Sequence, residues 1–269
     1  MQRSLSPNMT DRKKGHERPS RYGLPLPEVC HLTLDKATIQ DRAVFIIGDV
    51  HGCYDELTEL MDKARTLENT VLFVFVGDLV NRGPKSKEVV KLLRRTDCYS
   101  VRGNHEETTL REHARLIKDP GYDLPERYQY IRKFDEGDLD YLKRLPYTIC
   151  IPSLQAIIVH AGLEPGVVLE EQCLTAMTHM RSLVQRGATD TTLLPSNRIS
   201  EGVPWASLWT GPEHVYYGHD KKRGYVEHGF ATGLDTGCVN GEHLTGMFIN
   251  GCRKTLTVPA RKQYWADTP

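Results

Sequence analysis

The first half of the sequence alternates short apolar runs with longer segments in which apolar residues recur every three or four positions. The apolar runs predict buried strands at 43–50, 71–79 and 98–104. Helical periodicity predicts helices at 53–67, 86–95 and 106–118. Because strands and helices alternate in this way, we expect a parallel sheet with crossover helices.

The pattern changes after a turn-rich loop at 119–125 and a short predicted helix at 135–145, which begins with acidic residues. We expect strands joined by short connections within 147–151, 156–162, 214–220, 225–236, 244–249 and 254–259. Short connections favour antiparallel pairing, so this half predicts a second, partly antiparallel sheet. The predicted fold class is α/β, with two packed mixed β-sheets flanked by helices.

No stretch between Ala43 and Pro259 has the composition of a linker, so we expect one catalytic domain at 41–260. Residues 1–40 are expected to form a disordered N-terminal tail, because the segment opens polar, basic and poor in large apolar residues. Residues 261–269 are expected to form a short C-terminal tail.

Composition narrows the class of protein. The 35 basic and 35 acidic residues balance, which argues against a global attraction to nucleic acid or membrane. No run of eighteen apolar residues and no secretory signal is present, so we expect no membrane span. The seven cysteines are scattered without a C-x-x-C pair, which argues against a disulfide framework or a zinc ribbon. We expect a cytoplasmic location, with a nuclear one as the alternative.

Polar residues follow the predicted strands at the point where each strand ends. These residues are Asp49, His51, Asp78, Asn104, His105, His160 and His219, most of them beside a glycine. Ligands gather at the carboxyl ends of strands in open α/β sheets. The neighbouring glycines suggest that backbone and ligands crowd into one place.

Six of these side chains form a mixed set of oxygen and nitrogen donors: Asp49, His51, Asp78, Asn104, His160 and His219. The set is too large for one tetrahedral zinc and suits two divalent ions that share a carboxylate. Two ions about 3.5–4 Å apart can activate a hydroxide and hold the attacked phosphoryl oxygen. Taken singly, each histidine or aspartate could instead be a core histidine or a turn former. Their recurrence at successive strand ends favours the metal site.

Five sequence blocks carry a resemblance to a known superfamily. They are GDVHG (48–52), GDLVNRG (77–83), GNHE (103–106), HAG (160–162) and GH (218–219). In this order they resemble the binuclear metallophosphoesterases of the phosphoprotein phosphatase superfamily. The resemblance covers residues 43–250 and implies a calcineurin-like sandwich of two sheets.

The resemblance also implies roles for the individual residues. It places Asp49, His51 and Asp78 on one metal, and it places Asp78, Asn104, His160 and His219 on the other. It implies that His105 is the general acid for the leaving oxygen. It implies that Arg82 clamps phosphate, which a guanidinium can grip with two hydrogen bonds.

One residue departs from the pattern of the protein serine/threonine phosphatases. They usually carry Asp where this chain has Asn81, and that Asp supports the catalytic histidine. Without it, we expect His105 to be more acidic or to use another partner such as Glu106 or Asp220.

Two later stretches, 204–220 and 233–249, resemble instead the ApaH-like phosphatases, relatives of symmetrical diadenosine tetraphosphatase. That branch implies cleavage of phosphoanhydrides in dinucleoside polyphosphates, inorganic polyphosphate or an mRNA cap. An aromatic residue usually follows the GLDTGCV block, where this chain has Asn240.

Further basic residues are candidates for binding substrate phosphates. Arg181 is the expected second phosphate-binding arginine, with a helix-surface arginine as the alternative. Lys221, Lys222 and Arg223 directly follow His219 and could hold further phosphates or form a solvated charge run. Trp205, Trp209 and Tyr217 could stack on a base, although core packing is the simpler expectation for each.

The sequence therefore predicts a phosphoanhydride hydrolase with two divalent ions. Manganese is the expected metal, and iron, zinc and magnesium are alternatives, because the donors are oxygen and nitrogen. The alternative functions are a protein serine/threonine phosphatase and a catalytically silent binding module. The expected partner is a phosphorylated small molecule, a polyphosphate or an RNA cap, and neither a membrane nor a protein partner is indicated.

Overall fold

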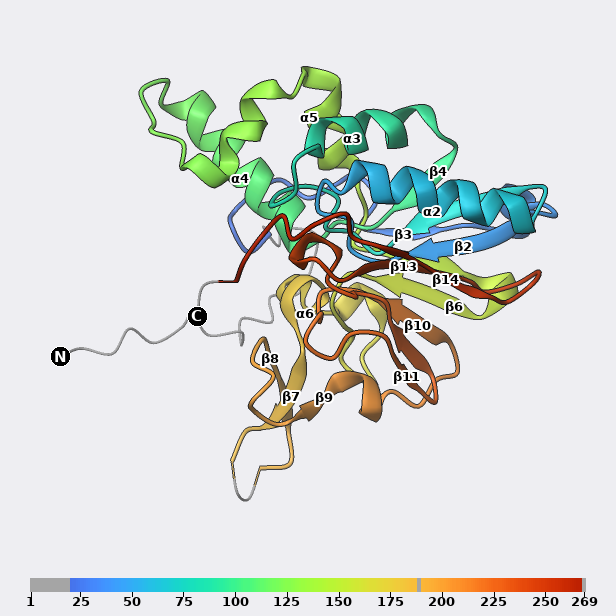
Figure 1. Cartoon of the computed structure of the whole chain (residues 1–269). Helices are drawn as coiled ribbons and strands as arrows, with labels where there is room; N and C mark the ends of the chain where they lie inside the picture. The colour runs from blue at the N-terminus through green and yellow to red at the C-terminus, as the bar shows by residue number, and fades with distance from the viewer. Residues whose placement is uncertain (1–19, 188–189, 268–269) are drawn as a thin grey trace.

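The computed structural model describes residues 20–187 and 190–267. A five-stranded mixed sheet has the order β14-β13-β2-β3-β4, in which β2, β3 and β4 run parallel. Its strands are β2 (Ala43–Ile47), β3 (Val71–Phe75), β4 (Cys98–Ser100), β13 (His243–Phe248) and β14 (Thr255–Pro259). The parallel part, with its crossover helices, confirms the prediction for the first half of the chain (Figure 1).

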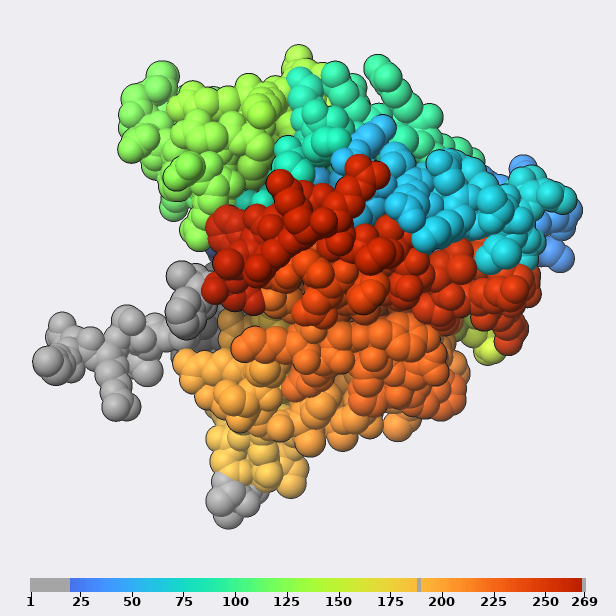
Figure 2. All heavy atoms as spheres, in the orientation of Figure 1, coloured from blue at the N-terminus to red at the C-terminus, as the bar shows by residue number. Residues whose placement is uncertain are grey.

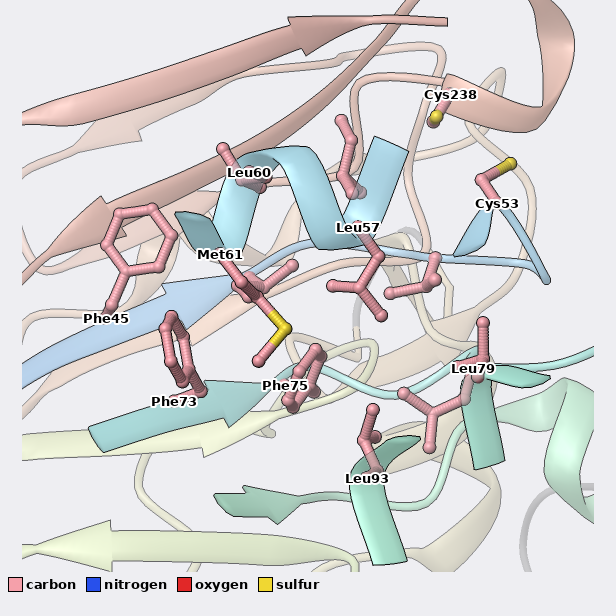
Figure 3. Close-up of a cluster of buried hydrophobic side chains, with 14 of the residues drawn as sticks. Phe45, Cys53, Leu57, Leu60, Met61, Phe73, Phe75, Leu79, Leu93 and Cys238 are labelled. Atoms are coloured by element: carbon pink, nitrogen blue, oxygen red, sulfur yellow. The ribbon is translucent and has the colours of Figure 1, made fainter. Parts of the chain in front are cut away.

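Helices cover the outer face of this sheet. They are α2 (Tyr54–Leu67), α3 (Ser86–Arg95), α4 (Asn104–Lys118), α5 (Glu136–Arg144) and the 3-10 helix η1 (Glu126–Lys133). Alternate strand residues such as Phe45 and Phe75 point toward Leu57 and Met61 of α2 (Figure 3). The apolar face that the sequence predicts for residues 53–67 is therefore the face that packs on the sheet.

A six-stranded mixed sheet packs on the inner face, with the order β1-β5-β6-β10-β12-β11. Its strands are β1 (His31–Thr33), β5 (Thr148–Ile151), β6 (Ala156–Val159), β10 (His214–Tyr217), β11 (Val226–His228) and β12 (Ala231–Gly233). Val44 and Ile46 of β2 share one buried cluster with Ile149 and Ile158 of the second sheet. Two packed mixed sheets are thus confirmed.

The outer face of the six-stranded sheet packs on α6 (Leu174–His179) and the 3-10 helix η4 (Trp205–Leu208), and Trp205 is a buried member of the apolar cluster between them. Beside it lies a three-stranded sheet, which was not predicted. Its strands are β7 (Ser182–Gln185), β8 (Leu193–Ser196) and β9 (Val203–Pro204). The remaining short helices are α1 (Lys36–Ile39), η2 (Pro152–Leu154), η3 (Leu169–Glu171) and η5 (Cys238–Asn240).

Both ends of the described chain pack against the domain. Strand β1 pairs in parallel with β5, so residues 31–33 of the expected N-terminal tail belong to a sheet. Residues 1–19 lie outside the described residues. In the expected C-terminal tail, Tyr264 and Trp265 pack against the helix-side core, which is the apolar cluster between the five-stranded sheet and its helices. Figure 2 shows this last part of the chain, in dark red, on the surface between green and orange segments. Among the described residues, no helix is both long and apolar enough to span a bilayer.

Candidate active site

Four strand ends meet at one edge of the sandwich. Asp49 and His51 follow β2, and Asp78 follows β3, its parallel neighbour. His160 follows β6 and His219 comes after β10, which are parallel neighbours in the facing sheet. All five side chains are buried. The predicted strand-end residues thus come together from both sheets.

Asp78 lies between two groups of histidine nitrogens. Its Oδ2 is 3.5 Å from Nε2 of His51 and 3.9 Å from Nε2 of His105. Its Oδ1 is 3.4 Å from Nε2 of His160. Two possible ion sites result, one of Asp78 with His51 and His105 and one of Asp78 with His160 and His219. Asp78 is therefore placed as a bridging carboxylate should be.

Main-chain carbonyls orient two of the histidine rings. Nδ1 of His51 lies 3.2 Å from the Val80 oxygen, and Nδ1 of His160 lies 2.8 Å from the Val76 oxygen. A ring nitrogen must donate to a carbonyl, so Nδ1 carries the proton in the neutral ring. The unprotonated Nε2 then faces the site, as metal ligation requires.

The other candidate ligands are held by the same loops. Nε2 of His219 lies 3.1 Å from the His179 oxygen, which turns Nδ1 of His219 toward the site. The carboxylate of Asp49 accepts the main-chain N–H of His219 at 3.1 and 3.2 Å. The side-chain oxygen of Asn104 lies 2.9 Å from Nε2 of His160. Asp49 and Asn104 are thus each held against a histidine of the site.

Burial shifts the protonation equilibria in the site. It raises the pKa of the Asp49 carboxyl well above its usual value, and it raises the pKa of Asp78 to about 7. It lowers the pKa of His160 to about 4, and it lowers the pKa of His51 well below its usual value. Clustered buried carboxylates and neutral imidazoles are a donor set that fits divalent cations, which would compensate the negative charge.

Glycines make the crowding possible. A Cβ atom on Gly103 would overlap Oδ1 of Asp78, and one on Gly218 would overlap Oδ1 of Asp49. Any side chain at either position would push a candidate ligand out of place. The crowding that the sequence suggested for these glycines is confirmed.

Left-handed backbone is concentrated in the site. Eight described non-glycine residues have positive φ, and five of them are site residues: His51, Asp78, Asn81, Arg82 and His219. This conformation costs about 1–3 kcal/mol per residue and persists only where the surroundings enforce it. The loops therefore hold these side chains at an energetic cost.

Glu106 enforces part of that conformation. Its buried carboxylate accepts the N–H groups of Asp78, Leu79, Val80 and Gly103 at 2.9, 2.8, 3.3 and 2.8 Å. Glu106 is therefore occupied by the β3 loop and does not partner His105. Sequence reasoning missed this positioning role, because it depends on a loop 26–28 residues away.

The partner of His105 is Asn81. The side-chain oxygen of Asn81 accepts the N–H of Arg82 at 2.8 Å, which fixes the orientation of the amide. Its Nδ2 then lies 2.9 Å from Nδ1 of His105. Asp220, the other alternative, instead accepts from Arg223. Neither expected alternative partner is used, and Asn81 itself contacts His105. Burial lowers the pKa of His105 well below its ordinary value, which is the expected direction.

The candidate ligands open into a cavity of about 600 Å³ with a cationic wall. Arg82, Arg181, Lys221 and Lys222 all line it. Arg181 follows α6 and donates to the main-chain oxygens of His219 and Asn197 at 3.0 and 3.1 Å. The structure therefore places Arg181 at the cavity and not on a helix surface.

Arg223 does not line the cavity. Its guanidinium donates to the main-chain oxygen of Arg181 at 2.9 Å, to Ser182 Oγ at 3.0 Å and to Asp220. These contacts tie Arg223 to the segment that carries Arg181, and direct phosphate binding by Arg223 stays a prediction.

Several residues at the cavity were not predicted. They are Arg127, Asn197, Arg198, Ile199, Ser200, Asp235, Trp265 and Asp267. Asp235 belongs to the GLDTG sequence and is buried, and burial raises its pKa. Its position after β12, another strand end, was the available signal. Arg127 lies in the 3-10 helix η1, and the others lie in loops and the tail, where periodicity gives no information.

The three aromatic residues named from the sequence lie outside the cavity. Trp205 and Tyr217 are buried against each other in the apolar cluster between the six-stranded sheet, α6 and η4, with ring centroids 4.9 Å apart. Trp209 is half-buried in the same cluster and donates its indole N–H to the Glu213 oxygen at 2.9 Å. Core packing is confirmed for all three.

Comparison with known proteins agrees with this geometry. The sequence profile of the calcineurin-like phosphoesterases matches residues 43–227. The chain belongs to the calcineurin-like phosphoesterase family. The resemblance inferred from its motifs is thereby confirmed, as is its assignment to a class of hydrolases. This family uses a binuclear divalent metal centre, which the two donor groups around Asp78 fit.

Two proteins of similar sequence are named as bis(5'-nucleosyl)-tetraphosphatases. The asymmetrical bis(5'-nucleosyl)-tetraphosphatase PrpE of Halalkalibacterium halodurans is 30% identical over 75% of this chain and 88% of its own. The symmetrical bis(5'-nucleosyl)-tetraphosphatase of Coxiella burnetii is 36% identical over 50% of this chain and 47% of its own.

A crystal structure of a candidate diadenosine tetraphosphatase superposes with a TM-score of 0.74 at 34% identity, over 86% of this chain and 98% of its own. A yeast protein serine/threonine phosphatase superposes with a TM-score of 0.56 at 16% identity, over 90% of this chain and 86% of its own. The second likeness concerns the fold alone.

Proposed function

We propose that this phosphoesterase hydrolyses phosphoanhydride bonds, in a dinucleoside polyphosphate, inorganic polyphosphate or the triphosphate of an mRNA cap. The names of the similar tetraphosphatases support the first of these. The observation that carries the proposal is the contact between Asn81 and His105.

That contact determines where His105 carries its proton. The Nδ2 group of Asn81 can only donate, so Nδ1 of His105 accepts and the ring proton of the neutral imidazole lies on Nε2. A doubly protonated ring would place a second N–H against the amide N–H. His105 therefore offers one proton from a neutral ring, which is a weak acid.

A weak acid suits an anhydride. The oxygen that leaves from an anhydride is a phosphate oxygen, which is a much weaker base than the alkoxide of serine. It needs little protonation in the transition state, so the neutral His105 is sufficient. A phosphoserine ester would require a stronger proton donor at this position.

We assign two divalent ions to the remaining donors. Asp49, His51 and Asp78 would hold one ion, and Asp78, Asn104, His160 and His219 would hold the other. When bound, the ions activate the attacking water and neutralise charge on the phosphoryl oxygens. Manganese is proposed first, because it accepts both oxygen and imidazole donors; iron, zinc and magnesium are the alternatives.

The cationic residues at the cavity are proposed to hold the substrate. Arg82, whose Nη1 is 3.3 Å from Nε2 of His51, stands beside the candidate ligands and would grip the attacked phosphate. Arg181, Lys221 and Lys222 would bind the further phosphates of an anhydride chain, as all three line the cavity.

A substrate panel tests this function. The chain, loaded with manganese, is incubated with diadenosine tetraphosphate, a cap analogue, long-chain polyphosphate and a phosphoserine peptide, and the products are separated by chromatography. Asp49→Asn serves as the metal-deficient control. Cleavage of at least one anhydride, abolished by the substitution, supports the proposal. Release of phosphate from the peptide alone would establish a protein phosphatase, and no cleavage would indicate a binding module.

All seven cysteines are free, which supports our proposal of a reducing, cytoplasmic location.

A further inference from the structure

The C-terminal segment, residues 260–267, is tied down along its length. Its main-chain N–H groups donate from Ala260 to the Glu242 oxygen at 2.8 Å, and from Tyr264 and Trp265 to the Val239 oxygen at 3.0 and 2.9 Å. A segment held in this way has a defined position, although its composition is that of a solvated tail.

Side chains from the domain hold the same segment. The buried carboxylate of Glu56 accepts the N–H of Arg261 at 2.9 Å and the hydroxyl of Tyr264 at 2.8 Å. Nδ2 of Asn240 donates to the Trp265 oxygen at 2.9 Å. Beyond Trp265, Asp267 pairs with Lys221 at the cavity. Trp265 is therefore bracketed by anchors on both sides.

The cavity into which this segment brings Trp265 is otherwise polar. Its lining includes the carboxylates and imidazoles of the candidate ligands and several cations, with Arg127 and Arg198 in addition to the predicted residues. Among the described residues that line it, only Ile199 and Trp265 are apolar. Trp265 is the one with a broad, flat ring face.

We propose that Trp265 is the stacking surface for a purine base of the substrate, a proposal that rests on the phosphoanhydride function above. A cavity of about 600 Å³ is of the size that takes a nucleotide-sized ligand. Phosphates bound by the cations would place the attached nucleoside away from the candidate ligands, where an aromatic surface is the complementary group for a base. Because the segment is already ordered, stacking costs little conformational entropy.

A purely structural role is the competing explanation, since Trp265 also packs against the helix-side core. The two roles differ in what can replace the indole. Leucine fills apolar space but has no ring face, whereas phenylalanine keeps a ring face. A base-stacking residue also matters only for substrates that carry a base.

The kinetic test uses both differences. For diadenosine tetraphosphate and for a cap analogue, KM is measured relative to KM for inorganic tripolyphosphate. Trp265→Leu is expected to raise this ratio by about 5- to 100-fold, and Trp265→Phe by much less. The matched control is Trp209→Leu, which should leave the ratio at the wild-type value. An effect on one nucleotide only would show which source supplies the base, and would support the proposal.

A binding measurement keeps this test independent of turnover. The chain has three tryptophans, of which Trp205 is buried and Trp209 lies away from the cavity. Titration with β,γ-methylene-ATP should quench the fluorescence of the wild type and of Trp209→Phe, but not of Trp265→Phe. Inorganic tripolyphosphate should quench none of them. Failure of hydrolysis with intact quenching would overturn only the proposed function. Equal KM changes for nucleotides and tripolyphosphate, or nucleotide quenching that persists in Trp265→Phe, would overturn the role of Trp265.

Discussion

Nδ2 of Asn81 lies 2.9 Å from Nδ1 of His105, and the other end of the same amide accepts the N–H of Arg82. The amide is therefore fixed at both ends and donates to the imidazole. This relationship keeps the proton of neutral His105 on Nε2, the nitrogen 3.9 Å from the Asp78 carboxylate. We propose that the Asn81 amide thereby favours weakly basic leaving groups, because it keeps His105 a neutral, weak acid.

The first prediction concerns His105 itself. His105→Ala should retain metal and lower kcat by about 10²–10⁴ on an alkyl phosphate ester, whose leaving alkoxide requires a proton; this is the usual worth of a general acid. The loss should be much smaller with a nitrophenyl phosphate ester, because nitrophenolate leaves without a proton. Steady-state kinetics on both substrates checks this. A loss of the same size for good and poor leaving groups would contradict the acid role.

The second prediction concerns Asn81. In Asn81→Asp, the new carboxylate accepts a hydrogen bond from the Nδ1–H group and stabilises the doubly protonated ring. Hydrolysis of a phosphoserine peptide should therefore rise relative to hydrolysis of diadenosine tetraphosphate. Asn69→Asp, a substitution of the same kind at an exposed asparagine outside the cavity, is the control for an added carboxylate. An unchanged ratio in Asn81→Asp would show that this residue does not determine the substrate class.

The third prediction concerns metal content. Asp78→Asn should lower the occupancy of both ions, because one carboxylate faces both groups of histidines. Elemental analysis of the purified variant measures this against a wild type that holds about two ions per chain. Retention of both ions in the variant would show that Asp78 does not bridge them.

The fourth prediction concerns stability after chelation. The pKa of Asp78 is raised from 3.8 to about 7, chiefly by burial. The stability associated with its neutral form is present below the ordinary pKa and is lost as the pH rises through about 7. In metal-free protein, Asp78→Asn should therefore raise Tm by several degrees at pH 8, with little effect at pH 4. Thermal unfolding in excess chelator tests it, and a variant less stable than wild type at pH 8 would refute it.

The fifth prediction concerns the phosphate clamp. Arg82→Lys keeps the charge but loses the planar pair of donors, so kcat/KM should fall by about 10- to 100-fold. Arg186→Lys is the matched control, because Arg186 is exposed and lies outside the cavity. Equal activity of the two variants would show that Arg82 does not clamp the phosphate.

The sequence predicts the central sheets and the candidate ligands well, for a physical reason. Buried parallel strands have continuous apolar runs, and the ligands must follow their carboxyl ends directly. Both signals are local, so Asp49, Asp78 and His160 could be named before the fold was known.

The parts that were missed depend on contacts between distant residues. Strands β7, β8 and β9 are two to four residues long, too short for a clear alternation. The C-terminal segment is polar, and its anchor Glu56 is 208 residues from Tyr264. Nothing local to residues 261–267 indicates that they reach the cavity.

This phosphoesterase is expected to prefer anhydrides to serine monoesters, because His105 lacks a carboxylate partner. This preference is tested most directly by kcat/KM of the manganese-loaded wild type on diadenosine tetraphosphate, a cap analogue and polyphosphate, each compared with a phosphoserine peptide. We expect a higher value for at least one anhydride than for the peptide. A higher value for the phosphoserine peptide than for every anhydride would contradict it.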